Sequence, residues 1–110
     1  MAAAVNVFRT FTETVGLTTS VFYTAPSGYT GVVLLAQVTN TGASTHTISF
    51  GYRRSGNDTP IVKDLAISAT DTANLLAGKL VVESGDSVSI VGNNATDLQF
   101  LASILETSNL

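Results

Sequence analysis

Both faces of the strand predicted at positions 31–39 carry apolar residues, within the segment YTGVVLLAQVTNTG at positions 29–42. Side chains alternate between the two faces of a strand. The even positions form a continuous apolar row: Val32, Leu34, Ala36 and Val38. The odd positions begin with Val33 and Leu35 and then become polar. A strand with one face in water rarely places two large aliphatic side chains on that face, so we expect another protein surface to cover Val33 and Leu35.

The last predicted strand, at positions 98–106, repeats this pattern. Its core-facing positions are apolar: Leu98, Phe100, Ala102 and Ile104. Leu101 and Leu105 stand on the opposite face among polar residues. We hypothesise that neighbouring subunits, or an N-terminal arm, cover an interface formed by Val33, Leu35, Leu101 and Leu105. The alternative is that register or local twist buries these side chains within one sandwich.

Strand-forming residues come in short runs along the whole chain, and turn residues interrupt them every eight to twelve positions. This rhythm predicts an all-β fold, a single antiparallel β-sandwich of the jelly-roll or immunoglobulin-like kind with about eight or nine strands. We expect the sandwich to span residues 17–110, and residues 1–16 to form an N-terminal arm or an edge strand. The segment RSGNDTP at 54–60 is predicted to be a loop. The remaining strands are expected near 21–24, 31–39, 45–53, 61–67, 72–76, 79–82 and 86–91.

Charged residues make up only 12% of the chain, against about 25% in a typical soluble domain. Polar but uncharged surfaces suit proteins that pack against neighbours, because a charge in an interface must be paired or else loses hydration. The composition therefore favours an assembled protein, with an uncharged secreted monomer as the alternative. The net charge of −3 and the lack of a basic stripe argue against nucleic-acid binding. We expect no membrane span and no secretory signal, because no long apolar run is present.

No cluster of residues specifies a chemistry. The single histidine, His46, has no carboxylate near it in sequence and is expected to be hydrogen-bonded locally. The eight acidic residues mostly fall at predicted turns, and the chain has no cysteine. We therefore expect no enzymatic activity, no cofactor and no metal site. A calcium ion shared by loops carrying Asp58 and Asp97 is an alternative left open.

Three further residues are candidates for contact with a partner. Tyr29 is predicted in a loop, and Arg53 and Arg54 are the only adjacent basic pair. Tyr and Arg are favoured at the centres of interfaces. The alternative is that Tyr29 caps the edge of the core and that water solvates both arginines.

The stretch VFYTAPSGYTGVVLLAQVTNTGASTHTISFGYR resembles small β-sandwich proteins of tailed-bacteriophage virions. The shared features are a strand ending in Tyr-Thr-x-Pro, an apolar strand closing on Val-x-Asn, and an alternating strand with Ile-x-Phe. A later apolar run, a Gly-Asp turn and a final strand complete the likeness, which covers residues 18–106. The segment MAAAVNVFRTFTETVG departs from the pattern.

The resemblance implies a structural protein of the virion, assembled in the host cytoplasm as a homo-oligomer, with no catalytic residues to carry over. We expect a capsid decoration (cement) protein whose partners are copies of itself and virion proteins such as the major capsid protein. A neck, tail or fibre-adaptor protein is the first alternative. A carbohydrate- or receptor-binding module is another, but the chain has no tryptophan, and Tyr29 is the only aromatic residue outside a predicted strand.

Overall fold

A computed structural model describes residues 6–109, and these residues form nine strands and no helix. The strands are β1 (Asn6–Thr14), β2 (Ser20–Thr24), β3 (Tyr29–Asn40), β4 (His46–Arg54), β5 (Asn57–Ile67), β6 (Thr72–Asn74), β7 (Leu80–Val82), β8 (Ser87–Gly92) and β9 (Leu98–Ser108). The all-β fold expected from the spacing of strand formers and turn residues is confirmed.

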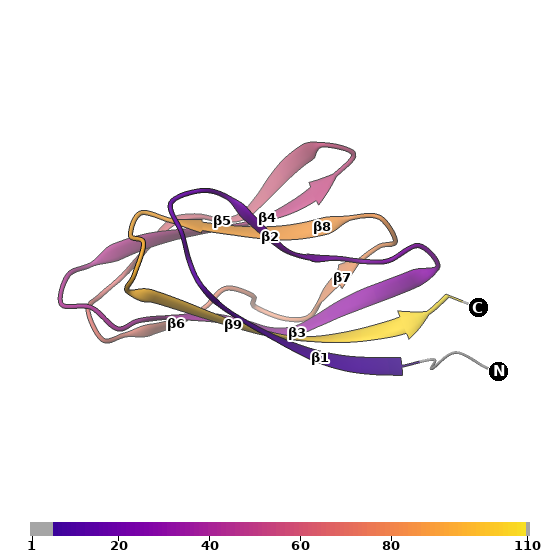
Figure 1. The fold of residues 1–110 in the computed structure, drawn as a ribbon, viewed down its shortest axis with the longest axis horizontal. Coiled ribbons are helices and arrows are strands. Elements are labelled where there is room, and N and C mark those ends of the chain that lie inside the picture. Colours follow the sequence, from indigo (N-terminus) through magenta and orange to yellow (C-terminus); the bar gives the residue numbers. More distant parts are fainter. Residues whose placement is uncertain (1–5, 110) are drawn as a thin grey trace.

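The strands form two antiparallel sheets that pack face to face (Figure 1). The five-stranded sheet has the order β1-β9-β3-β6, with β7 also paired to β3, and the four-stranded sheet has the order β2-β8-β4-β5. Taken as one interrupted strand, β6 and β7 give eight strands in two four-stranded layers. The chain changes sheet at every connection except β4–β5 and β6–β7. This is the jelly-roll arrangement rather than the immunoglobulin-like one, in which consecutive strands share a sheet more often.

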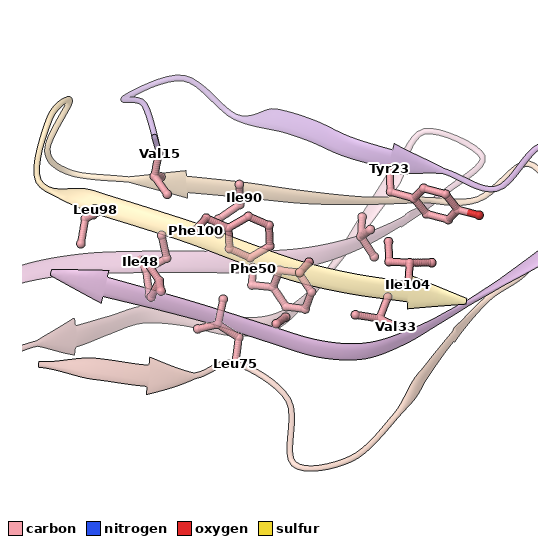
Figure 2. Packing of buried hydrophobic residues seen from close by; sticks show 14 of the residues in the cluster. Val15, Tyr23, Val33, Ile48, Phe50, Leu75, Ile90, Leu98, Phe100 and Ile104 are labelled. Atoms are coloured by element: carbon pink, nitrogen blue, oxygen red, sulfur yellow. The ribbon is translucent and has the colours of Figure 1, made fainter. Parts of the chain in front are cut away.

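The core lies between the two sheets and is built by alternation along the strands (Figure 2). On β9 the predicted core positions, from Leu98 to Ile104, are all buried, and on β4 Ile48 and Phe50 are buried in the same way. The rings of Phe22, Phe50 and Phe100 meet in the middle, with the centroids of Phe22 and Phe100 4.7 Å apart. Since these rings come from β2, β4 and β9, they join both layers.

A β-bulge in β3 changes which side chains face the core. The register with β9 shifts between Val33 and Leu35, so that Val33 lies opposite Ile104 and Leu35 lies opposite Ser103. A bulge adds one residue and so reverses the parity of the positions that follow it. Val33 and Ala36 are therefore both buried, whereas Leu34 and Leu35 are exposed. The expectation that Val33 belongs to an interface is wrong, because this side chain is fully buried within its own chain.

The predicted loop at 54–60 is instead a tight hairpin. Strand β4 runs to Arg54 and β5 begins at Asn57, which leaves only Ser55 and Gly56 in the turn. Both turn residues have positive φ, 51° and 80°, as a two-residue type I′ turn requires. Pro60 is accommodated because β5 is an edge strand, where a missing N–H costs no ladder hydrogen bond.

The N-terminal segment was expected to be either an arm or an edge strand, and its described part forms strand β1. It pairs with β9 over nine consecutive residue pairs, from Asn6–Thr107 to Thr14–Gln99. Residues 6–14 are therefore an edge strand of the five-stranded sheet and not an arm that leaves the domain. The part of the prediction that concerns residues 1–5 lies outside the described residues.

Candidate interaction surface

The outer face of the five-stranded sheet carries no charged side chain at any of its paired strand positions within residues 6–109. The register places on this face the even positions of β1, the odd positions of β9, and the residues of β3, β6 and β7 that lie opposite them. All of these residues are Thr, Ser, Asn, Gln, Val, Leu or Phe. By contrast, the outer side of the four-stranded sheet and its hairpin carry Arg53, Lys63 and Asp64. The two faces of the sandwich are therefore chemically different.

An apolar row crosses this uncharged outer face. Phe8 lies opposite Leu105, Leu105 opposite Val32, and Val32 opposite Val81, so that four neighbouring strands contribute one side chain each. Phe8 is 74% exposed and Val81 is 53% exposed, and Leu105 and Val32 are partly exposed. Such neighbouring exposed side chains are unusual on a monomer and mark interaction surfaces.

Three of the four predicted interface leucines and valines lie on this face. Leu35 is 36% exposed and stands opposite Ser103 on β9, between the partly exposed Leu101 and Leu105. Phe8, Val32 and Val81 also belong to this surface and were not among the residues predicted from the sequence. Phe8 could have been predicted on this face, because its position has the opposite parity to Val7 and Phe11. The place of Val32 and Val81 on this face depends on the bulge in β3 and on the pairing of β7 with β3.

The other predicted contact residues lie elsewhere. Tyr29 is the first residue of β3 and is partly buried, so it is not in a loop. Arg53 pairs with Asp58 across the β4–β5 hairpin through two hydrogen bonds of 2.7 and 3.2 Å. Arg54 pairs with Asp86 and Glu83 at 2.8 and 3.2 Å. Both guanidinium groups are thus engaged within the chain rather than solvated freely.

Asp86 lies in the turn between β7 and β8 and is the centre of a polar cluster. Its carboxylate accepts hydrogen bonds from Tyr52 Oη at 2.6 Å and from Arg54 Nε at 2.8 Å. The bond from Arg54, followed by that from Tyr52, lowers the pKa of the Asp86 carboxyl. Burial, together with the bond to Asp86, raises the pKa of the Tyr52 hydroxyl. The cluster fastens β4 to the β7–β8 turn.

His46 and Asp97 form a second polar pair at the other end of β4. Their Nε2 and Oδ2 atoms are 2.9 Å apart, and the bond to His46 lowers the pKa of the Asp97 carboxyl. His46 is therefore bonded to a residue distant in sequence rather than locally. Asp58 lies near the opposite end of β4, across from Arg53, while Asp97 contacts its first residue. Nearly the whole length of β4, at about 3.3 Å per residue, therefore separates the two loops, which is too far for one calcium ion to bind both.

Within residues 6–109, no group of three or more His, Cys, Asp or Glu residues is placed to hold a metal ion. The same residues contain no helix that could cross a membrane.

A third polar cluster, in which Tyr23 Oη donates to Glu106 at 2.9 Å, closes the end of the sandwich near the start of β1. Each of these clusters joins segments that are distant in sequence.

The lowered pKa values of Asp86 and Asp97 predict a loss of stability in acid. A carboxyl whose pKa is lower in the folded state stabilises the fold above its unfolded pKa and ceases to do so as the pH falls through its folded pKa. We expect the free energy of unfolding to be nearly constant from pH 7 to about 5 and to fall below about pH 4. Denaturant unfolding across this range is the measurement.

The acid dependence has a matched pair of variants. Asp86→Asn should reduce the steepness of the decline, because the variant has one fewer shifted carboxyl. Asp71→Asn removes a carboxyl that forms no ion pair among residues 6–109, and its Oδ1 can still accept from the N–H of Thr72, so the decline should be retained. An unaltered pH profile for Asp86→Asn would show that the hydrogen bonds to Asp86 do not favour its ionised form.

Comparisons with known proteins give the fold and no family. No protein-family model matches the chain, and no curated protein matches it in sequence. A chain from the acid-stable capsid of Helicobacter pylori bacteriophage KHP30 superposes with a TM-score of 0.58 and 15% identity, over 96% of this chain and 90% of that one. A chain from Bacillus endospore appendages, described as a novel family of disulfide-linked pili, superposes with a TM-score of 0.56 and 18% identity, over 94% and 87%. This protein therefore has a β-sandwich fold similar to that of a phage-capsid chain and of a bacterial-pilus chain.

Proposed function

We propose that this protein is a structural subunit of a tailed-phage virion, most specifically a capsid decoration protein that stabilises the particle through subunit contacts. The observation that carries the proposal is the charge-free outer face with its exposed row of Phe8, Leu105, Val32 and Val81. Such a face can be buried without desolvating a charge. The phage-capsid and pilus chains of the same fold support a role in assembly.

The assembly contacts are non-covalent in this proposal. The pili whose subunit has a similar fold are described as disulfide-linked, whereas this chain has no cysteine. Burial of apolar surface contributes about 25 cal/mol per Å², so a few hundred Å² per copy supplies several kcal/mol before association costs are subtracted. Repetition around a symmetric shell multiplies this contribution through avidity.

The proposal assigns no catalytic role, cofactor or nucleic-acid partner to the chain. A neck, tail or fibre-adaptor protein is the alternative within the virion, since the same face would serve there. Antibody labelling of intact particles separates these positions, because a decoration protein labels the head and an adaptor labels the neck or tail.

Incorporation into particles tests the proposal. We expect Val81→Lys to reduce the amount of the protein in purified virions at least tenfold, because the variant places a charge in the apolar row. Val21→Lys is the matched control: Val21 is 43% exposed, close to the 53% of Val81, but it lies on the other sheet. The measurement is quantitative mass spectrometry of particles from a host that produces each variant. Virions that contain none of the unmodified protein would refute the proposed function.

A further inference from the structure

The four sheet edges of the sandwich differ in how well they are protected against pairing with another chain. Strand β5 contains Pro60, two register shifts and a residue of positive φ, Asp64. Strand β2 is five residues long and irregular, and β6 and β7 have three residues each. Proline, bulges, charge and short length are the usual protections of an edge. These three edges are therefore poor templates for strand addition.

Strand β1 has none of the protections that act on the backbone. It is nine residues long, pairs with β9 without any shift in register, and contains neither proline nor glycine. On its far side it pairs with no strand among residues 6–109. A long and regular edge of this kind offers a row of unpaired N–H and C=O groups to an added strand.

The register shows which backbone groups of β1 face outward. Val15 continues the pairing and donates its N–H to the carbonyl oxygen of Leu98 at 2.9 Å. Hydrogen-bonded pairs alternate along an antiparallel ladder, so the odd positions of β1 bond to β9. The N–H and C=O groups of Phe8, Thr10, Thr12 and Thr14 therefore point toward the open edge.

We propose that β1 pairs antiparallel with β1 of a second copy, across a twofold axis at Phe11. This inference deepens the proposed assembly role and rests on it. The even positions then bond across the axis, with Thr10 opposite the partner's Thr12 and Phe8 opposite the partner's Thr14. Two-fold pairing of identical strands is a closed arrangement and joins the two five-stranded sheets into one.

Charge selects this register over its neighbours. With the axis at Phe11, Arg9 stands opposite the partner's Glu13, in a pair whose side chains approach closely because it is not hydrogen-bonded. An axis at Thr10 would put Arg9 opposite the partner's Phe11, and an axis at Arg9 would oppose two like charges. Arg9 also contacts Glu106 at 3.4 Å, but a guanidinium group has five N–H donors and can serve both carboxylates.

The solution mass of the purified protein and two matched sets of variants test the pairing. We expect the unmodified protein to form dimers or larger multiples of the 11.4 kDa chain at micromolar concentration. Thr10→Pro removes an outward N–H and should give the monomer mass, whereas Thr10→Val keeps that N–H and should associate normally. Light scattering after size-exclusion chromatography is the measurement, and circular dichroism confirms that each variant is folded.

A charge swap provides the second test. Glu13→Lys puts like charges opposite each other twice in the dimer and should raise the dissociation constant about tenfold or more. Arg9→Glu combined with Glu13→Lys and Glu106→Gln restores opposite charges across the axis without setting a carboxylate against Glu106, and should recover association. An oligomer whose mass is insensitive to Thr10→Pro and Glu13→Lys would overturn the pairing and leave the assembly role intact. A protein that is monomeric alone would also overturn it, and the assembly role would then be decided by incorporation into virions.

Discussion

Phe100→Ala is expected to lower the free energy of unfolding by about 3–5 kcal/mol. Phe100 is fully buried and lies beside Phe50 of β4 in the core (Figure 2). Its ring also contacts the ring of Phe22 from β2. Truncation therefore leaves a cavity between the two sheets that neither layer can close without moving the other. Domains of this size are stable by about 5–15 kcal/mol in total, so the variant should lose a large part of its stability.

Urea unfolding followed by circular dichroism measures this loss. Leu17→Ala is the control, because it truncates a large apolar side chain at a site that is 63% exposed and lies outside the proposed contacts. Its free energy of unfolding should change by no more than about 0.5 kcal/mol. A similar loss for both variants would mean that the aromatic cluster does not hold the sheets together.

The fold class follows from features that the sequence displays locally. Alternation at 46–52 and at 98–104 predicts which face of β4 and of β9 is buried, and the structure agrees. The turn residues also place most strand boundaries within a few residues. Both signals depend only on neighbours in the chain, which is why they can be read without knowing the pairing of the strands.

The orientation of β3 could not be obtained in this way. In its run of five apolar residues from Val32 to Ala36, either the odd or the even positions could face the core. The bulge that decides between them is seen only in the register with β9. Gly31 illustrates the same dependence, because a side chain there would meet the ring of Tyr23 from β2. Such close approaches arise from tertiary packing, and a single sequence does not record them.

Only part of the candidate interaction surface could be predicted, because strand pairing brings the rest of it together. Leu35, Leu101 and Leu105 are recognisable because each breaks the alternation of its own strand. Val81 stands beside them only because β7 pairs with β3. The polar clusters around Asp86 and Asp97 were not predicted at all, since their members are up to 51 residues apart in sequence.

Substitution of Asn40 is expected to have a large effect on stability, because this polar side chain is fully buried at the end of β3. Its Nδ2 group donates to the carbonyl oxygens of Ser44 and Ile67 at 2.8 and 3.0 Å, and its Oδ1 accepts from the N–H of Gly42 at 2.9 Å. The amide thus satisfies three backbone groups and ties the β3–β4 loop to the end of β5. Both donor positions face oxygen atoms, so only an amide fits this site.

Asn40→Asp is therefore expected to lower the free energy of unfolding by at least about 3 kcal/mol at neutral pH, because an ionised carboxylate would face two carbonyl oxygens. Burial and these oxygens raise the pKa of the new carboxyl in the folded state, so the penalty should be smallest in acid and grow as the pH rises above about 4. Asn74→Asp makes the same substitution at an exposed position of β6 and should show neither effect. Thermal and urea unfolding at several pH values measure both variants. If Asn40→Asp were as stable as the unmodified protein at neutral pH, the Asn40 amide could not be the donor that joins Ser44 to Ile67.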